Sequence, residues 1–419
     1  MKHKTYVQCL FALLILNTIA NAQVATSQPT APTLQPALPT PSGKYPIGRQ
    51  AFDLIDTSRK DQLSPDSSAH RELMIYIWYP AQPSAPQPHA EYFPGAGKLA
   101  TNPTAQQTMQ DVLGPTWPLI VSGSITSHAT ANATPATQAG GFPVVLFSHG
   151  ISAITFSYTA QIEDLVSHGY IVAAIEHTDA SGIVVFPDGR IRLSQDPPPP
   201  SSPPKDPMKA MIDSAKEGTQ IGADDLRFVL DTLLQKKIPL TQVMDLSRVA
   251  AVGHSYGGTL TARACQLDPR VKACISEDGE VNPVGAFFDY PDHASFKQPF
   301  LLTEIASRHS DDELAHMGET RAKWNEYLAH ERQQLDSSPA GSYHIVLSGQ
   351  GMTHASFSDG LLLSATPGST QASTALSNLL LTEELDRSFL DKYLKKVPTP
   401  LLDQIANIPS GVTVEHIGR

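Results

Sequence analysis

The chain has 419 residues, of which 41% are hydrophobic and 17% are charged, which is ample for a buried core. Its 30 basic and 41 acidic side chains give a formal net charge of −11, and a surface of that sign repels phosphate backbones and argues against a nucleic-acid partner. Proline is over-represented at 35 residues, but 18 of these lie in three patches, at 29–46, 80–94 and 197–207, and the rest of the chain has a globular composition.

The N-terminus has the pattern of a secretory signal. Residues 1–22 begin with Lys2 and Lys4, continue through an apolar run at 9–16 and end in Ala20-Asn21-Ala22. This pattern predicts a signal peptide cleaved near Ala22 and an exported protein, either periplasmic or extracellular. The alternative is an uncleaved membrane anchor, which is disfavoured because the apolar run is shorter than the roughly 20 residues that span a bilayer.

The remainder is predicted to form one domain behind a linker. Residues 23–45 are rich in Pro, Thr, Ala and Ser and have no apolar period, so we expect a disordered linker. The range 46–419 is then a single catalytic domain. A Ser/Thr/Ala-rich insert near 121–140 and the proline excursion at 197–207 interrupt it, and both are candidates to border a substrate pocket.

Strands alternate with helices along this domain. An early strand is predicted at 71–79, and the later strands, several of them apolar at every position, are predicted at 143–147, 170–175, 249–252, 271–276, 300–303 and 343–347. Helical periodicity is found at 157–168, 209–235, from 256 to about 267, 311–335 and 382–394, and a hairpin is predicted at 184–193. Continuously apolar strands are buried on both faces, so we expect an α/β fold with a mostly parallel, doubly wound sheet and helices on both faces.

A motif for nucleophilic catalysis lies between a strand and a helix. Gly253-His254-Ser255-Tyr256-Gly257 matches G-x-S-x-G directly after the strand 249–252. In this context the sharp turn exposes the serine hydroxyl, and the glycines leave room for neighbouring elements. We predict Ser255 as the nucleophile and the backbone amide of Tyr256 as one oxyanion donor.

A serine nucleophile requires a histidine base, which in this chain order follows both the serine and an acid. Seven histidines follow Ser255; of these, His309, His316 and His330 fall in or beside the polar helical stretch, and His344 lies inside a strand. His354 follows the strand 343–347 in a glycine-rich loop, so it is the predicted base.

The acid that orients this histidine has two candidates. Asp278 follows the strand 271–276 and Glu304 follows the strand 300–303, so both lie at the expected end of the sheet. Asp268 precedes its strand and lies at the wrong end. The residues alone leave Asp278 and Glu304 as equal alternatives.

The second oxyanion donor is expected after the strand 144–147. Ser148-His149-Gly150-Ile151 forms that turn, with the amide of Ile151 as the donor and His149 as a structural residue that shapes the loop. Cys265 and Cys274 flank a turn and are compatible either with a disulfide or with two buried thiols. Neither cysteine has the neighbours of a metal or redox site, and we expect no metal and no cofactor.

Four segments together resemble the platelet-activating factor acetylhydrolase family, the plasma and bacterial type of α/β-hydrolase. They are Leu146–Gly150, Ser167–His177, Gly253–Gly258 and Thr353–Asp359, and the likeness runs from about 46 to 395. The resemblance implies Asp278 as the acid, Ile151 and Tyr256 as oxyanion donors, and calcium-independent hydrolysis of short or oxidised acyl groups on phospholipids and small esters. Such a substrate allows transient contact with a lipid surface. Glu176-His177 is interpreted as sheet-edge structure.

Two other functions compete with a secreted serine esterase of this kind. A hydrolase of polyesters or cutin-like polymers uses a related elbow and would present an open, shallow groove. A catalytically silent hydrolase fold used for ligand binding is a third interpretation, and the presence of Ser255, Asp278 and His354 argues against it.

Overall fold

The computed structural model describes the chain from residue 36 to residue 418, except residues 62, 63, 65, 85, 86, 195–206, 282–294, 307–309, 317–319 and 405–407. The predicted signal peptide 1–22, the linker residues 23–35 and residues 197–206 of the proline excursion lie outside the described residues. Predictions on these segments therefore stay predictions.

A ten-stranded sheet forms the centre of the described chain, in the order β12-β11-β10-β9-β8-β4-β5-β2-β1-β3. Its strands are β1 (Ile47–Lys60), β2 (His70–Pro80), β3 (Thr130–Ala131), β4 (Phe142–Ser148), β5 (Ile171–Glu176), β8 (Met244–His254), β9 (Val271–Glu277), β10 (Phe300–Ile305), β11 (Ser342–Leu347) and β12 (Val412–Ile417). The strands from β11 to β5 run parallel, whereas β12, β2 and β1 each pair antiparallel with their inner neighbour.

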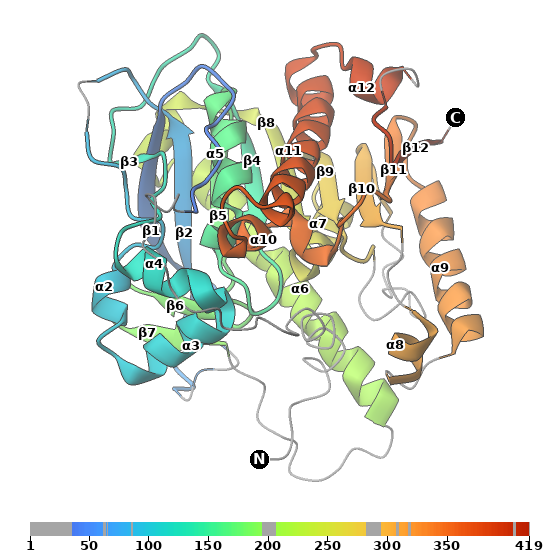
Figure 1. Ribbon diagram of the computed structural model, residues 1–419, viewed down its shortest axis with the longest axis horizontal. Coiled ribbons are helices and arrows are strands. Elements are labelled where there is room, and N and C mark those ends of the chain that lie inside the picture. The colour runs from blue at the N-terminus through green and yellow to red at the C-terminus, as the bar shows by residue number, and fades with distance from the viewer. Residues whose placement is uncertain are drawn as a thin grey trace.

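Helices cover both faces of this sheet (Figure 1). On one face lie α5 (Thr159–Ser167) and α11 (Thr370–Leu390), and on the other lie α6 (Pro207–Leu234) and α7 (Tyr256–Leu267). Val145 and Phe147 of β4 pack into the first layer, and Val144 and Leu146 pack into the second. The side chains of β4 are thus buried on both faces of the sheet. The predicted α/β fold with a mostly parallel, doubly wound sheet is confirmed.

Shorter elements are inserted at the ends of the strands. Between β2 and β4 lie α2 (Ala96–Leu99), α3 (Pro103–Leu113), η1 (Gly114–Thr116) and α4 (Trp117–Val121), beside the hairpin of β6 (Ile183–Val185) and β7 (Ile191–Leu193) (Figure 1). The others are η2 (Thr155–Tyr158), η3 (Pro239–Val243), α8 (Asp311–His316), α9 (Arg321–Asp336), η4 (His354–Phe357), α10 (Gly360–Ser364), the π turn η5 (Asp391–Lys395) and α12 (Pro400–Asp403). Every helix among the described residues is too short or too polar to cross a membrane.

Two predicted boundaries were wrong. The final helix was expected at 382–394, but α11 begins at Thr370 because Ser369 caps it by accepting a hydrogen bond from the amide of Ala372. The expected linker also ends early: Leu38 is buried, and the amide of Ser42 donates to Asp164 on α5 at 2.9 Å. The second half of that segment is therefore part of the folded body.

The insert near 121–140 lies along the β1 edge of the sheet. Its strand β3 pairs with β1, and Ser127 and the amide of His128 donate to the buried Glu163 on α5. The segment therefore closes the sheet edge. The two cysteines form a disulfide, Cys265–Cys274, that joins the end of α7 to the start of β9.

Candidate active site

The predicted nucleophile lies on a strained turn between β8 and α7. Ser255 has φ 57° and ψ −125°, a conformation that side chains rarely adopt, and such strain costs on the order of 1–3 kcal/mol. The flanking glycines are needed because a Cβ atom on Gly253 would lie 2.2 Å from the carbonyl oxygen of Gly257, and one on Gly257 would lie 2.2 Å from that of Ser148. The motif therefore folds as the sharp elbow that its spacing predicts.

Three of the predicted site residues lie in one hydrogen-bonded row. The Nε2 atom of His354 is 2.9 Å from Oγ of Ser255, and its Nδ1 atom is 2.6 Å from Oδ2 of Asp278. Because a carboxylate only accepts, Nδ1 carries the proton and Nε2 is left to accept from the serine hydroxyl. The arrangement can remove a proton from Ser255.

Asp278 comes directly after β9, and hydrogen bonds hold both its backbone and its side chain. Its backbone has φ 46°, its amide donates to the carbonyl of Thr303 at 2.6 Å, and its Oδ1 atom accepts from the amide of Ile305 at 3.1 Å. The alternative acid, Glu304, lies elsewhere, with Oε1 3.2 Å from Nε2 of His344. The geometry thus brings Asp278, and not Glu304, to His354.

The loop after β4 lies against the elbow. A Cβ atom on Gly150 would be 3.3 Å from Cβ of Ser255, so the backbone of this loop directly adjoins the serine. Ile151 follows it, and Tyr256 is the first residue of α7, where the helix dipole favours negative charge. Both predicted oxyanion donors are therefore near the serine.

Buried polar side chains support this loop from behind. Nδ1 of His149 donates to the carbonyl of Gly150 at 2.7 Å, and its Nε2 atom is 2.7 Å from Oγ of Ser181, which is also 2.7 Å from Oε2 of Glu176. Burial, with a smaller effect of His177, lowers the pKa of His149 to about 3, and burial raises the pKa of Glu176 to about 7. His149 thus stays a neutral structural residue, as its sequence context predicts.

Two residues that the sequence did not single out also contact the site. His254 precedes the nucleophile, and its Nε2 atom donates to the carbonyl of His354 at 2.9 Å. Its Nδ1 atom is 2.9 Å from the hydroxyl of Tyr158, which accepts from the amide of Gly150 at 3.0 Å. The search for a base considered only histidines that follow the serine, so His254 was left out. Its place directly before Ser255 in the motif is the signal that could have identified it.

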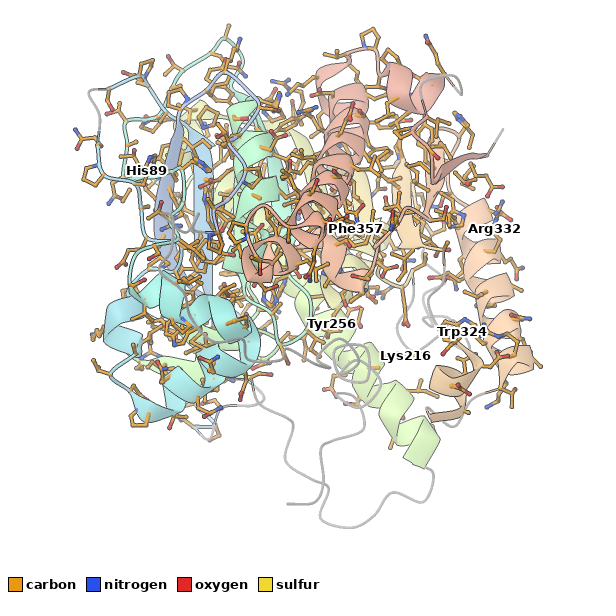
Figure 2. The ribbon with its side chains drawn as sticks, viewed as in Figure 1. His89, Lys216, Tyr256, Trp324, Arg332 and Phe357 are labelled. Carbon is orange, nitrogen blue, oxygen red and sulfur yellow. A yellow bond between two sulfur atoms is a disulfide. The ribbon has the colours of Figure 1, made fainter. Side chains whose placement is uncertain are left out.

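The loop that carries His354 is anchored to α5. Asp359, fully buried, accepts hydrogen bonds from the hydroxyl of Tyr92 and from the amides of Thr159 and Ala160 at the start of α5. Burial raises the pKa of Asp359 to about 8. Phe357 stacks on the ring of His254 at 5.3 Å between centroids, and Figure 2 shows Phe357 and Tyr256 in the centre of the molecule.

A buried pair of acids lies beneath Asp278. The amide of Gln161 on α5 donates to both Glu277 of β9 and Asp386 of α11, so the two carboxyl groups face each other. Burial, reinforced by Asp386, raises the pKa of Glu277 well above its ordinary value, and burial raises the pKa of Asp386 to about 6. Among the described residues there is no group of three or more His, Cys, Asp or Glu side chains that could hold a metal ion.

Comparisons with known proteins place this fold and site in a class. Residues 145–415 match the sequence model of the alpha/beta hydrolase family, so the chain belongs to that family. Residues 31–190 match the model of platelet-activating factor acetylhydrolase, isoform II. This match, together with curated relatives of the same name, confirms the resemblance read from the four segments.

The individual relatives are distant. The platelet-activating factor acetylhydrolase of the dog is 27% identical over 279 residues, covering 60% of this chain and 56% of the relative. The bovine enzyme of the same name is 27% identical over 289 residues, covering 60% and 57%. The chain thus spans little more than half the length of these curated relatives. A solved structure, a ferulic acid esterase from Streptomyces cinnamoneus, has a TM-score of 0.67 at 27% identity and covers 91% of this chain and 99% of its own.

Proposed function

We propose that this protein is a carboxylic ester hydrolase that works through an acyl-serine intermediate on Ser255. The observation that carries the proposal is the row of hydrogen bonds from Asp278 through His354 to Ser255. A weak serine nucleophile becomes reactive when a histidine can take its proton and a carboxylate holds that histidine in the right tautomer.

The reaction proceeds in two halves. Oγ of Ser255 attacks the ester carbonyl carbon while Nε2 of His354 takes the hydroxyl proton, and the amides of Ile151 and Tyr256 stabilise the oxyanion. The bond to the alkoxide then breaks, His354 gives it the proton so that it leaves as an alcohol, and the acyl group remains on Oγ of Ser255. Water attacks the acyl group, gives its proton to His354, and the carboxylic acid is released as the proton returns to Ser255.

For the substrate, we propose short or oxidised acyl esters of phospholipids, or small esters. The similarity of residues 31–190 to platelet-activating factor acetylhydrolase, isoform II, supports this class. Ser255 is only 7% exposed, which favours a slim acyl group over a polymer chain lying across an open surface. A polyester hydrolase, the alternative raised by the sequence, requires the more open surface.

The test is a panel of p-nitrophenyl esters from C2 to C12, with 1-alkyl-2-acetylglycerophosphocholine and methyl ferulate, on wild type and Ser255→Ala. We expect hydrolysis that is greatest for the shortest acyl chains and that falls by about 10⁴-fold or more in the variant. Ser364→Ala on α10 is the matched control, because it removes an exposed serine hydroxyl whose partner is the carbonyl of Gly360.

Each outcome decides between the competing functions. Activity that survives in Ser255→Ala would overturn the acyl-serine mechanism. A maximum at C12, or cleavage of a solid polyester with no activity on the acetyl phospholipid, would support the polymer hydrolase. Binding of the phospholipid without turnover in wild type would support the silent ligand-binding fold.

A further inference from the structure

A continuous chain of hydrogen bonds runs behind Ser255. It starts at the amide of Gly150, passes through the hydroxyl of Tyr158 and the ring of His254, and ends at the carbonyl oxygen of His354. The three contacts measure 3.0, 2.9 and 2.9 Å in that order. The chain therefore connects the loop of the predicted oxyanion donor to the loop of the predicted base.

The direction of each hydrogen bond follows from the end groups. A carbonyl oxygen only accepts, so Nε2 of His254 carries a proton and donates it to His354. In a neutral ring Nδ1 then accepts from the hydroxyl of Tyr158, whose oxygen keeps a lone pair for the amide of Gly150. Burial, and next the charge that His354 acquires, lower the pKa of His254 well below its ordinary value, so the ring stays neutral.

The packing leaves these two side chains little freedom. Tyr158 is 2% exposed, and its ring lies 5.1 Å from that of Phe147 between centroids. The ring of His254 lies 4.5 Å from that of His354 and is stacked on that of Phe357 at 5.3 Å between centroids. Side chains locked by packing can hold neighbouring loops at a fixed spacing.

The two connected loops have no direct link through the sheet. The oxyanion loop follows β4 and the histidine loop follows β11, and β8, β9 and β10 lie between these strands. Their relative position therefore depends on contacts above the sheet. A misplacement of about 1 Å between catalytic groups can cost about 100-fold in rate.

We propose that Tyr158 and His254 are positioning residues that set the spacing between the amide of Ile151 and Nε2 of His354. Neither side chain touches the reacting atoms. The inference rests on the proposed ester hydrolysis, and it adds that the oxyanion donor and the base are held as one rigid unit.

The test uses variants that cut the chain at different bonds. Tyr158→Phe removes the central hydroxyl and keeps the ring. His254→Gln keeps a donor near the position of Nε2, whereas His254→Asn keeps an acceptor near the position of Nδ1. Tyr170→Phe is the matched control, because Tyr170 is also fully buried and its hydroxyl donates to Asp391 at 2.6 Å, away from the site.

We expect Tyr158→Phe and His254→Asn to lower kcat on p-nitrophenyl acetate by about 10- to 100-fold while KM changes by less than about threefold. The inhibition constant of a trifluoromethyl ketone, which forms an oxyanion on the serine, should rise in parallel. His254→Gln should recover part of the loss, because it keeps the bond to His354. The kcat of the double variant of Tyr158→Phe and His254→Asn should be no lower than that of the more impaired single variant, because both substitutions break the same chain of hydrogen bonds.

The opposite results would overturn the inference. If Tyr158→Phe loses thermal stability but keeps kcat, as Tyr170→Phe should, its role is structural only. Additive losses in the double variant would mean that the two residues act separately. If Tyr158→Phe does not fold, His254→Asn and His254→Gln are compared instead. Equal losses of kcat in these two variants would contradict a role for the hydrogen bond to His354.

Failure of the proposed function gives a different signature. In that case wild type itself would lack hydrolysis that depends on Ser255. The low-field proton resonance of His354 bonded to Asp278 needs no substrate, and it should shift in Tyr158→Phe and stay in place in Tyr170→Phe. If wild type is active and the resonance is unchanged in Tyr158→Phe, the positioning role is contradicted and the proposed ester hydrolysis is not.

Discussion

The carboxylates of two carboxylate–histidine pairs come from neighbouring strands, since Asp278 directly follows β9 and Glu304 lies on β10, and the first pair adjoins the predicted nucleophile. In the first pair, Asp278 is 2.6 Å from His354, whose other ring nitrogen faces the hydroxyl of Ser255. In the second, Glu304 is 3.2 Å from His344, whose other nitrogen lies 3.5 Å from Glu415. The group that faces the second ring nitrogen thus distinguishes the two histidines: a hydroxyl faces the predicted base His354, and a second carboxylate faces His344.

The two pairs also differ in the charged groups that surround them. Burial lowers the pKa of His344, but the carboxylates of Glu304 and Glu415 outweigh it and raise the pKa above its ordinary value. Glu415 is also held by a two-pronged contact with Arg332. The second pair is thus part of a charged network on the β11–β12 side, whereas the first rests on the buried acids Glu277 and Asp386.

The largest expected effect separates the two acids directly. Asp278→Asn should lower kcat for a short ester by about 10⁴-fold, because an amide no longer holds His354 in the tautomer that can accept from Ser255. Glu304→Gln, the matched control, should change kcat by less than about twofold. Steady-state kinetics on both variants tests the difference, and an equal loss would contradict the assignment of Asp278.

The buried acids beneath the first pair predict a smaller effect on stability. Their pKa values are raised in the folded protein, so it binds more protons than the unfolded chain. The free energy of unfolding should therefore fall as the pH rises above about 4, through the folded pKa of Asp386 near 6 and beyond it for Glu277, by up to about 1.4 kcal/mol per pH unit for each proton.

Glu277→Gln removes one of these protons and should flatten that slope. Glu384→Gln, on the exposed side of α11, is the control and should leave the slope unchanged. Urea unfolding at a series of pH values measures both. A wild-type stability that rises between pH 6 and 9 would contradict a protonated pair.

The smallest effect concerns the second pair. Because the folded pKa of His344 is raised, its stabilisation is fully present below its unfolded pKa of about 6.5 and is lost as the pH rises through the folded value. His344→Gln should therefore cost about 0.5–1 kcal/mol near pH 5.5 and nothing near pH 9, with kcat unchanged. Thermal unfolding at the two pH values tests this prediction. A loss of kcat in His344→Gln would contradict the conclusion that the second pair lies outside the active site.

The sequence predicted the central strands well because each contains a short run of mostly apolar residues. It missed β1, in which buried and exposed side chains alternate, and it missed the antiparallel strand β12. Ser255 and His354 could be located from local spacing and chain order. The choice between Asp278 and Glu304 could not, because both acids were expected directly after adjacent parallel strands. In the structure Glu304 lies within β10 and faces His344, and Asp278 directly follows β9 and contacts His354.

The backbone at Ser255 and Asp278 has a further consequence for how this protein can change. Both residues have positive φ values, 57° and 46°, which glycine adopts without cost. At these two positions the amino acid that best suits the folded chain is not the one that best suits the proposed chemistry. Selection for heat resistance alone would therefore act against the backbone strain at both residues, so thermostability and the proposed catalysis compete there.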